Sequence, residues 1–219
     1  ALQSQINPHF LYNTLESITW MIEGERNDDA VFMISQLARL FRISLSKGRT
    51  IISIKDELQH AQSYMNIQKI RYKNTFSVEF DVAPELYAYC TVKLILQPIL
   101  ENSISYGVGE MDDCGEIRVE GKMEGDEILL SVTDNGIGMS KEEAGLVLTD
   151  SNRIRKRGSG VGLVNVNRRI QIYFGKEYGL TVESEPDEGT KVTIRIPAVP
   201  YTEEDTLALE RGHSFGGED

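Results

Sequence analysis

The 219-residue sequence has only two cysteines and no long hydrophobic run. Neither Cys90 nor Cys114 has a partner at the spacing of a zinc site, so no structural metal is expected, and two unpaired thiols indicate a reducing cytoplasm. No apolar run approaches the roughly 18–20 residues that span a bilayer. Because the chain opens at Ala1 inside a helical pattern, we expect it to be the cytoplasmic portion of a longer, membrane-anchored protein.

Basic residues are also scarce relative to acidic ones. The chain has 23 Lys and Arg against 34 Asp and Glu, a net charge of −11. Binding to a nucleic-acid backbone requires clustered excess Lys and Arg, so no nucleic-acid partner is expected. Residues 202–219 hold six of the acids and a single arginine, Arg211. We expect residues 200–219 to form an acidic, mobile tail on a mildly acidic body.

Helical periodicity dominates the first part of the chain. Apolar residues three and four apart form one stripe over residues 2–23 and a second stripe that stops at Gly48. The pattern predicts an antiparallel helical hairpin, which cannot cover its own apolar face. We therefore expect two copies of the chain to form a four-helix bundle. The stripes consist of Leu2, Ile6, Phe10, Leu11, Leu15, Ile18 and Ile22, and of Val31, Ile34, Leu37, Ala38, Phe41 and Leu45.

A third helix, capped by Asp56 and reaching about Tyr72, would complete a helical dimerisation domain over residues 1–73. From residue 74 the pattern changes to strands with intervening helices. Strands are expected at 76–82, 117–122, 128–133, 180–184 and 190–196. Helices are expected at 92–106, kinked or starting late because of Pro98, and at 161–174. The predicted fold class is α+β, with a mixed-sheet α/β sandwich over residues 74–199.

Three separated segments of the second domain carry candidate chemistry. Asn102 lies on the helix around 96–103, the run Asp-Asn-Gly-Ile-Gly-Met (134–139) closes a strand, and Gly-Ser-Gly-Val-Gly-Leu (158–163) opens a helix. Taken singly, each has an ordinary interpretation as a surface asparagine, a turn or a weak glycine signal. The last segment lacks the preceding strand of a dinucleotide-binding fingerprint.

Together the three segments predict a nucleotide site. Asp134, with Gly136 and Gly138 making room beside it, can accept a hydrogen bond from a nucleobase amino group. Thr190, just after Gly189, is a second candidate for an adenine contact.

The phosphate end of the site would use the other two segments. Gly158, Gly160 and Gly162 at a helix start let backbone N–H groups approach phosphates, which the helix dipole also favours. Asn102 offers an oxygen to Mg²⁺, an ion that binds through few protein groups together with phosphates and water. We therefore expect an adenine nucleotide and Mg²⁺ as ligands.

The order of these segments resembles the N, G1 and G2 boxes of the ATP-binding (Bergerat-type) fold shared by DNA gyrase, heat-shock chaperones, histidine kinases and mismatch-repair ATPases. The run Gly-Thr-Lys-Val-Thr-Ile-Arg-Ile-Pro (189–197) resembles the final strand of histidine kinase catalytic domains. The run Gln-Ile-Asn-Pro-His-Phe-Leu-Tyr-Asn-Thr-Leu (5–15) is similar to the phosphoacceptor segment of LytS-like sensor histidine kinases. The resemblance extends from about residue 2 to residue 197.

This resemblance implies a two-component reaction. The γ-phosphoryl group of ATP would move to an imidazole nitrogen of His9 and then to an aspartate of a response regulator. Asn13 lies one turn beyond His9 on the same face, and by analogy it would orient a water for the reverse removal of phosphate from the regulator. An asparagine on a helix is also often simply solvated. His60 and His213 lack this context and are expected on a helix surface and in the tail.

The sequence departs from the family pattern beside the phosphoacceptor histidine and beside the predicted phosphate site. Phe10 follows His9 where common histidine kinases have an acid, which leaves Glu16 as a distant candidate for orienting the imidazole. Ser105 replaces a basic residue that would touch a phosphate. A short lid over residues 140–157 carries four basic residues that could compensate or simply be solvated: Arg153, Arg155, Lys156 and Arg157.

Two other functions fit parts of the sequence. A degenerate nucleotide-sensing module that binds ATP or ADP without transferring phosphate is favoured by Ser105. An ATPase-driven clamp or an anti-sigma-type Ser/Thr kinase would use the same ATP fold. The N-terminal acceptor segment argues against the second alternative, because such proteins need no helix of that kind.

Overall fold

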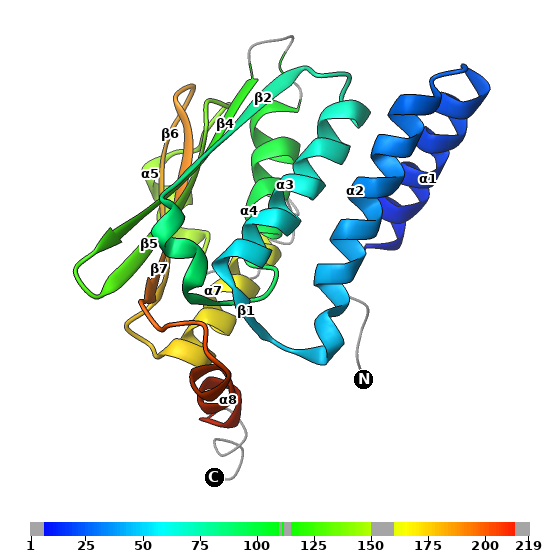
Figure 1. The fold of residues 1–219 in the computed structure, drawn as a ribbon. Helices are drawn as coiled ribbons and strands as arrows, with labels where there is room; N and C mark the ends of the chain where they lie inside the picture. The colour runs from blue at the N-terminus through cyan, green and yellow to red at the C-terminus, as the bar shows by residue number, and fades with distance from the viewer. Residues whose placement is uncertain (1–6, 110, 112–114, 150–159, 213–219) are drawn as a thin grey trace.

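The computed structural model describes residues 7–109, 111, 115–149 and 160–212 (Figure 1). Two long helices, α1 (Pro8–Glu23) and α2 (Asn27–Leu45), form a hairpin at one side of the molecule. Helix α3 (Ile54–Arg71) lies beside α2, and a five-stranded sheet forms the opposite side. The predicted hairpin is confirmed, although residues 1–6 of its first stripe lie outside the described residues.

Helix α1 begins where the sequence provides a cap. The Asn7 side chain accepts a hydrogen bond from the His9 backbone N–H at 3.0 Å, and Pro8 occupies the first helical position, where no N–H is needed. The hairpin turn follows Gly24, whose N–H donates to the Trp20 carbonyl oxygen.

The apolar side chains of the hairpin divide between two faces. Phe10 and Ile18 of α1 are buried inside the chain, and Leu37 and Leu40 of α2 are buried with them because α3 packs against the hairpin. Other members of the predicted stripes stay exposed: Leu15, Ile22, Val31, Ile34 and Leu45. Each predicted stripe therefore divides between a face buried within the chain and an exposed face. The packing of α3 on the buried face was not predicted.

Helix α3 is joined to the second domain as well as to the hairpin. Its N-cap is Ser53, whose hydroxyl accepts a hydrogen bond from the Asp56 N–H at 3.0 Å, so the prediction of Asp56 as the cap was wrong. The strand just before it, β1 (Ile51–Ser53), pairs antiparallel with β3 (Cys90–Val92). The chain leaving the hairpin thus pairs with a strand of the second domain before α3 begins.

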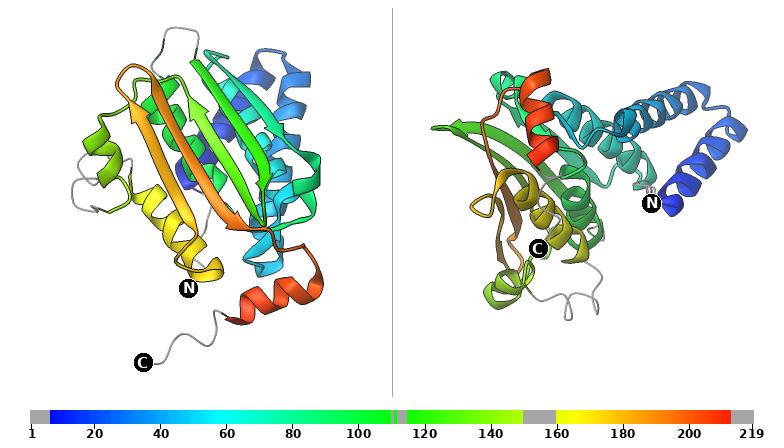
Figure 2. Two further views of the ribbon diagram at one scale, coloured as in Figure 1. Left: turned by 90° about the vertical axis from the view of Figure 1, so that its left-hand side faces the viewer. Right: turned by 90° about the horizontal axis from the view of Figure 1, so that it is seen from below.

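The main sheet has the strand order β2-β4-β5-β7-β6, with β2 parallel to β4 and the other neighbours antiparallel. This mixed sheet was predicted. One face is covered by α4 (Leu96–Asn102) and α7 (Gly160–Phe174), and Figure 2 shows the other face open. The strands are β2 (Phe76–Val82), β4 (Gly115–Glu124), β5 (Glu127–Asp134), β6 (Gly179–Glu185) and β7 (Gly189–Pro197).

Helix α4 starts late, as Pro98 predicts, because proline is tolerated only in the first turn. It continues into a wider π-helical segment, Ser103–Val108, in which the Gly109 N–H donates to the Ile104 carbonyl oxygen at 2.8 Å. π-Helical turns of this kind are frequent at functional sites.

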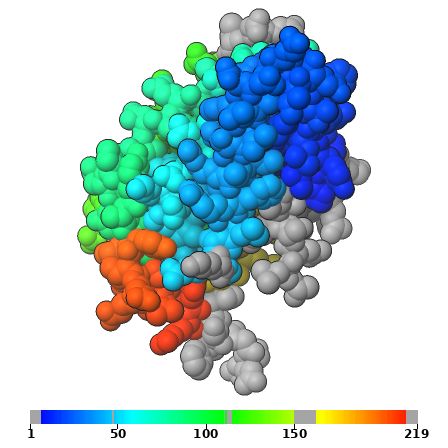
Figure 3. Space-filling model, turned by 45° about the vertical axis from the view of Figure 1, so that its right-hand side comes forward, coloured from blue at the N-terminus to red at the C-terminus, as the bar shows by residue number. Residues whose placement is uncertain are grey.

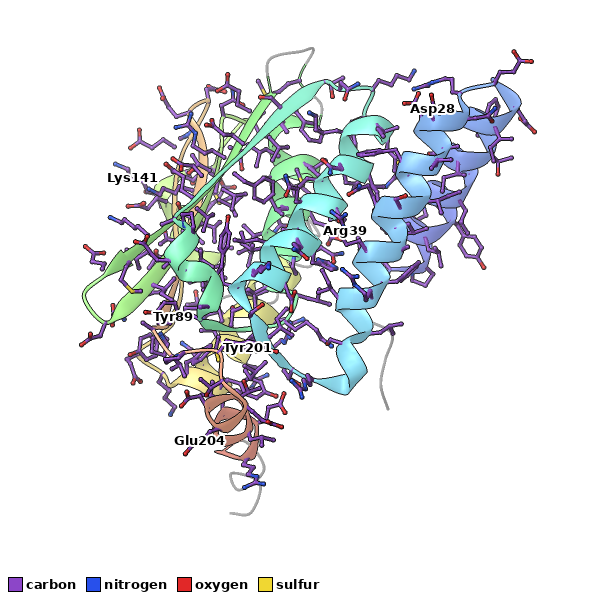
Figure 4. All side chains as sticks on the ribbon, viewed as in Figure 1. Asp28, Arg39, Tyr89, Lys141, Tyr201 and Glu204 are labelled. Carbon is purple, nitrogen blue, oxygen red and sulfur yellow. The ribbon has the colours of Figure 1, made fainter. Side chains whose placement is uncertain are left out.

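The prediction of a mobile tail from residue 200 is wrong for residues 203–212, which form helix α8 (Glu203–Gly212). The acids at 203–205 fill its first turn, where the helix dipole favours negative charge. Their place at the helix start therefore stabilises α8, although a run of acids suggested a solvated tail. The Glu210 carboxylate accepts hydrogen bonds from the Thr50 and Ile51 N–H groups at 2.9 and 3.1 Å. Figure 4 labels Tyr201, whose N–H donates to the Ala88 carbonyl oxygen, ahead of Glu204 on α8. Residues 213–219 lie outside the described residues.

Among the helices of the described residues, none has both the length and the apolar character required to cross a membrane.

Candidate functional site

Asp134 is the centre of the predicted adenine end. It ends β5 and is 5% exposed. Its Oδ1 accepts a hydrogen bond from the Gly136 N–H at 3.0 Å, and the Ser103 hydroxyl and the Thr190 N–H also donate to the carboxylate. Burial raises the pKa of Asp134, and these three hydrogen bonds act against that rise. A buried carboxylate fixed in this way is a precise acceptor for one more donor.

Thr190 lies directly opposite Asp134, because β5 and β7 are paired in that register. The Thr190 hydroxyl is 2.9 Å from the Ser184 hydroxyl, which also donates to the Gly189 carbonyl oxygen at 2.7 Å. The Met139 N–H donates to the same Ser184 oxygen at 2.9 Å. Ser184 therefore links β6 to the glycine loop after β5. Its position in the sequence looks like any other strand residue, so this role could not be predicted.

The glycines of the loop after β5 permit a close approach of backbones. A Cβ on Gly136 would collide with the Gly107 Cα, and a Cβ on Gly107 would lie 2.8 Å from Asp134 Oδ1. Gly138 has a φ of +62° and faces the Glu185 carbonyl oxygen, so it too has no room for a side chain. Gly107 was missed in the sequence, although a glycine inside a helical pattern often marks such a contact.

Asn102 is the last residue of α4 and is half-buried. Its amide nitrogen Nδ2 is buried and has no hydrogen-bond partner among the described residues. An orphaned buried donor is unusual in a folded protein, so Asn102 is not a simply solvated surface residue. The next residue, Ser103, donates to Asp134, which places Asn102 one position from the adenine end.

Helix α7 supplies the third segment. Gly160 is its first residue, and a Cβ on Gly162 would lie 3.3 Å from the Pro98 Cβ, so the start of α7 packs on α4. Arg157, Gly158 and the other basic residues of the predicted lid lie outside the described residues. Of the lid, the structure describes helix α5 (Lys141–Leu146), which a Ser140–Glu143 capping box begins.

His9 occupies the first turn of α1 and is exposed. Its neighbour Phe10 is 5% exposed and stacks against Tyr64 of α3, with ring centroids 5.3 Å apart. The Asn13 Nδ2 atom is 3.2 Å from His9 Nδ1 and 3.4 Å from Nε2. The aromatic residue after the histidine thus anchors the helix, and the side chain in contact with the imidazole is Asn13 rather than the distant candidate Glu16.

The two predicted centres lie apart in this structure. Helix α3 stands between α1 and the sheet (Figure 1), and the start of α1 packs directly on α3 through the contact of Phe10 with Tyr64. His9 is therefore on the outer helix, whereas Asn102, Asp134 and Thr190 are gathered on the other side of α3. The prediction for His60 was wrong, because this residue is fully buried on α3, with Nε2 at 3.0 Å from the Ser44 hydroxyl. His213 lies outside the described residues.

Comparison with known families decides the class. Residues 91–200 match the family model described as "Histidine kinase-, DNA gyrase B-, and HSP90-like ATPase", and residues 1–76 match the one described as "Histidine kinase". The chain belongs to the histidine kinase-, DNA gyrase B- and HSP90-like ATPase family. The predicted fold of the ATP-binding part is thereby confirmed.

Several proteins similar to this chain are named sensor histidine kinases or sensor proteins. The chain is 36% identical over 197 residues to sensor histidine kinase YesM of Bacillus subtilis, covering 90% of this chain and 33% of that protein. It is 32% identical to BtsS of Escherichia coli over 196 residues (90% and 32%) and 32% identical to sensor protein LytS of Bacillus anthracis over 201 residues (90% and 33%). The resemblance to LytS-like kinases is confirmed, and the chain spans about a third of the length of these relatives.

Solved structures agree on the fold. The catalytic domain of histidine kinase ThkA has a TM-score of 0.54 at 14% identity, covering 69% of this chain and 96% of that one. Acinetobacter baumannii histidine kinase AdeS has a TM-score of 0.50 at 12% identity, covering 86% of this chain and 95% of that one.

The residues present fit ATP, the nucleotide that this family implies. Asp134 supplies a buried acceptor, the glycines leave space beside it, and the buried amide nitrogen of Asn102 has no hydrogen-bond partner within the described part of the chain. The side-chain oxygen of Asn102 is of the kind that Mg²⁺ takes, because that ion binds oxygen ligands and few protein groups together with phosphates.

Proposed function

We propose that the chain is the kinase core of a two-component sensor, which phosphorylates its own His9 from ATP and passes the phosphoryl group to a response regulator aspartate. The observation that carries the proposal is the exposed imidazole of His9 on a helix that Phe10 anchors, in the same chain as an ATP-binding fold. The names of the relatives support it, and the comparisons lend no support to the alternatives of a nucleotide sensor or an ATPase clamp.

The proposed transfer needs positioning more than covalent help. The lone pair of an imidazole nitrogen forms a bond to the γ-phosphorus as the bond to the bridging oxygen breaks, and ADP leaves. Asp134 and Thr190 hold the adenine, and the first residues of α7 direct N–H groups at the phosphates. Mg²⁺, held by Asn102, would neutralise phosphate charge. In the second step an aspartate carboxylate of the regulator attacks the phosphorus and frees His9.

Asn13 has a separate proposed role. Its amide contacts the imidazole of His9 at 3.2 Å, so it is placed to orient that ring during phosphorylation. The same amide would orient a water during removal of phosphate from the regulator.

Because α3 stands between the sheet and α1, the helix that carries His9, the proposed reaction requires the ATP-binding part to approach the His9 of its own or of a partner chain. The exposed apolar face of the hairpin favours such a partner. Figure 3 shows α1 and α2 forming one continuous outer surface. The exposed large apolar residues of the two helices are Tyr12, Leu15, Trp20, Ile22, Val31, Phe32, Ile34 and Leu45. Exposed apolar side chains gathered on one helical hairpin mark an interaction site, and we propose a homodimer through a four-helix bundle.

The dimer predicts a specific charge effect at Leu15, which is 46% exposed. We expect Leu15→Lys to weaken dimerisation by about a hundredfold, because the bundle would bury an unpaired ammonium. Light scattering after gel filtration would show a monomer, whereas Glu16→Lys, at an exposed polar neighbour, would stay dimeric. A Leu15→Lys protein that remains dimeric at low micromolar concentration would contradict the interface. Ile18, 6% exposed, is unsuitable because its substitution would disturb the fold of the single chain.

Incubation with labelled ATP and Mg²⁺ tests the proposed function. Protein-bound label that is labile in acid and stable in alkali supports the kinase. Bound nucleotide without protein label would instead support the nucleotide-sensing alternative. Release of free phosphate without labelled protein would support an ATPase.

We further propose that this core is the cytoplasmic part of a longer membrane sensor. The relatives are named sensor kinases, and the chain corresponds to a third of each.

A further inference from the structure

Helix α4, which carries Asn102, begins without a capping side chain of its own. Its N-cap residue is Ile95, which cannot accept a hydrogen bond from the first turn. The N–H groups of Leu94, Ile95 and Leu96 instead donate to the carboxylate of Glu57, at 2.8, 2.8 and 2.9 Å. Glu57 lies on α3, 37 to 39 residues earlier in the chain, and is fully buried. A distant residue therefore supplies both the cap and the negative charge that a helix N-terminus favours.

The same turn is held from the other side by α7. The guanidinium of Arg169 donates to the carbonyl oxygens of Lys93 and Leu94, and its charge attracts the Glu57 carboxylate. Leu94 has a φ of +58°, in the left-handed region that non-glycine residues rarely adopt. Such a conformation persists only where the surroundings fix it, and here Glu57 and Arg169 fix the two sides of one peptide turn.

The turn also reaches the end of the hairpin. The Lys93 ammonium donates to the Ser44 carbonyl oxygen at 2.9 Å and to the Ser46 hydroxyl at 3.1 Å. Ser44 belongs to α2, so the turn at 93–96 contacts the hairpin end, α3 and α7 together. A fully buried carboxylate is costly unless it is hydrogen-bonded, and filling space alone would not require one.

A shift of this turn would move the ATP site. Helix α4 is only seven residues long, Asn102 is its last residue, and Ser103 beyond it donates to Asp134. We propose that Glu57 is a positioning residue of the ATP site, which sets the place of Asn102 by holding the start of α4 and so couples α3 to nucleotide binding. The proposal rests on the proposed function in taking Asn102 and Asp134 as the nucleotide-binding residues.

Glu57→Gln tests this coupling in the full chain. A glutamine has a single acceptor oxygen, and its amide NH₂ would face one of the three N–H groups. We expect the dissociation constant for Mg·ATP, measured by calorimetry, to rise about tenfold, the loss expected for a hydrogen bond to a charged group. The autophosphorylation rate at saturating ATP should also fall about tenfold. Saturating ATP fills the site of the variant, but Asn102 stays displaced from its place beside the nucleotide. Asp56→Asn, at the half-buried neighbouring carboxylate, should change either value by less than about twofold.

The measurements are made well below the unfolding temperature, where circular dichroism shows the variant folded. A lower melting temperature with wild-type affinity and rate would mean that Glu57 is only structural and would overturn the proposal. If Glu57→Gln does not fold, Arg169→Gln tests the same turn from the half-buried opposite side and should give the same losses. Wild-type affinity and rate in that variant would be equally contradictory. Failure of the wild-type chain itself to bind Mg·ATP would count against the proposed function instead.

Discussion

Replacing Asp134 with asparagine is expected to weaken ATP and ADP binding by about a hundredfold or more while leaving the fold intact. The carboxylate already accepts hydrogen bonds from Ser103, Gly136 and Thr190. The two oxygens of a carboxylate have capacity for a fourth donor, the adenine amino group, whereas the single amide oxygen of asparagine does not. A site that loses its acceptor for a ligand donor loses affinity steeply.

The fold should tolerate this substitution because a neutral amide is cheaper to bury than the Asp134 carboxylate, whose pKa burial raises. Calorimetry with ADP measures the affinity, and thermal unfolding checks the fold. Asp81→Asn makes the same exchange at an exposed position of β2 and should bind as the wild type does. Undiminished affinity in Asp134→Asn would show that the adenine assignment is wrong.

The second large effect is expected at His9. We expect His9→Gln to lose all acid-labile phosphorylation, a decrease of more than about a thousandfold, while its affinity for Mg·ATP stays within about twofold of wild type. Glutamine keeps a polar group for Asn13 to contact but has no nucleophilic ring nitrogen. His9 is exposed, so the stability change should be small.

Radiolabel retained on the filter after alkaline washing measures the phosphorylated protein. His213→Gln makes the same exchange in the acidic C-terminal segment and should be labelled normally. Persistent labelling of the His9→Gln protein would place the acceptor elsewhere.

The helices and strands were largely predictable because their signals are local. Residues close together in the sequence determine the apolar spacing of the hairpin, the alternation of β4 and β5 and the late start of α4 at Pro98. The same use of local signals failed for α8, because the acids at 203–205 were interpreted as part of a solvated tail and not as the first turn of a helix. It also missed that α3 covers one face of the hairpin, which leaves Leu15 rather than Ile18 as the better probe of a dimer.

The candidate site was predictable only where a motif names the residue. Asp134 and Thr190 come together because β5 pairs with β7, and their motifs had already marked both. Ser103, Gly107 and Ser184 act through contacts with distant segments, so no local pattern signals them. Glu57 is the extreme case, since its partners begin 37 residues further along the chain and are backbone groups, which any sequence provides.

The proposed function depends on the transfer of a phosphoryl group from the ATP site to one imidazole. The most direct test is to incubate the wild-type chain with ATP and Mg²⁺ and to locate the phosphate by mass spectrometry of peptides prepared at alkaline pH. We expect a single phosphoramidate, on His9, which is absent from the Asp134→Asn protein incubated in parallel. Phosphate on a serine, a threonine or another histidine, or tightly bound ATP with no phosphorylated residue, would contradict it.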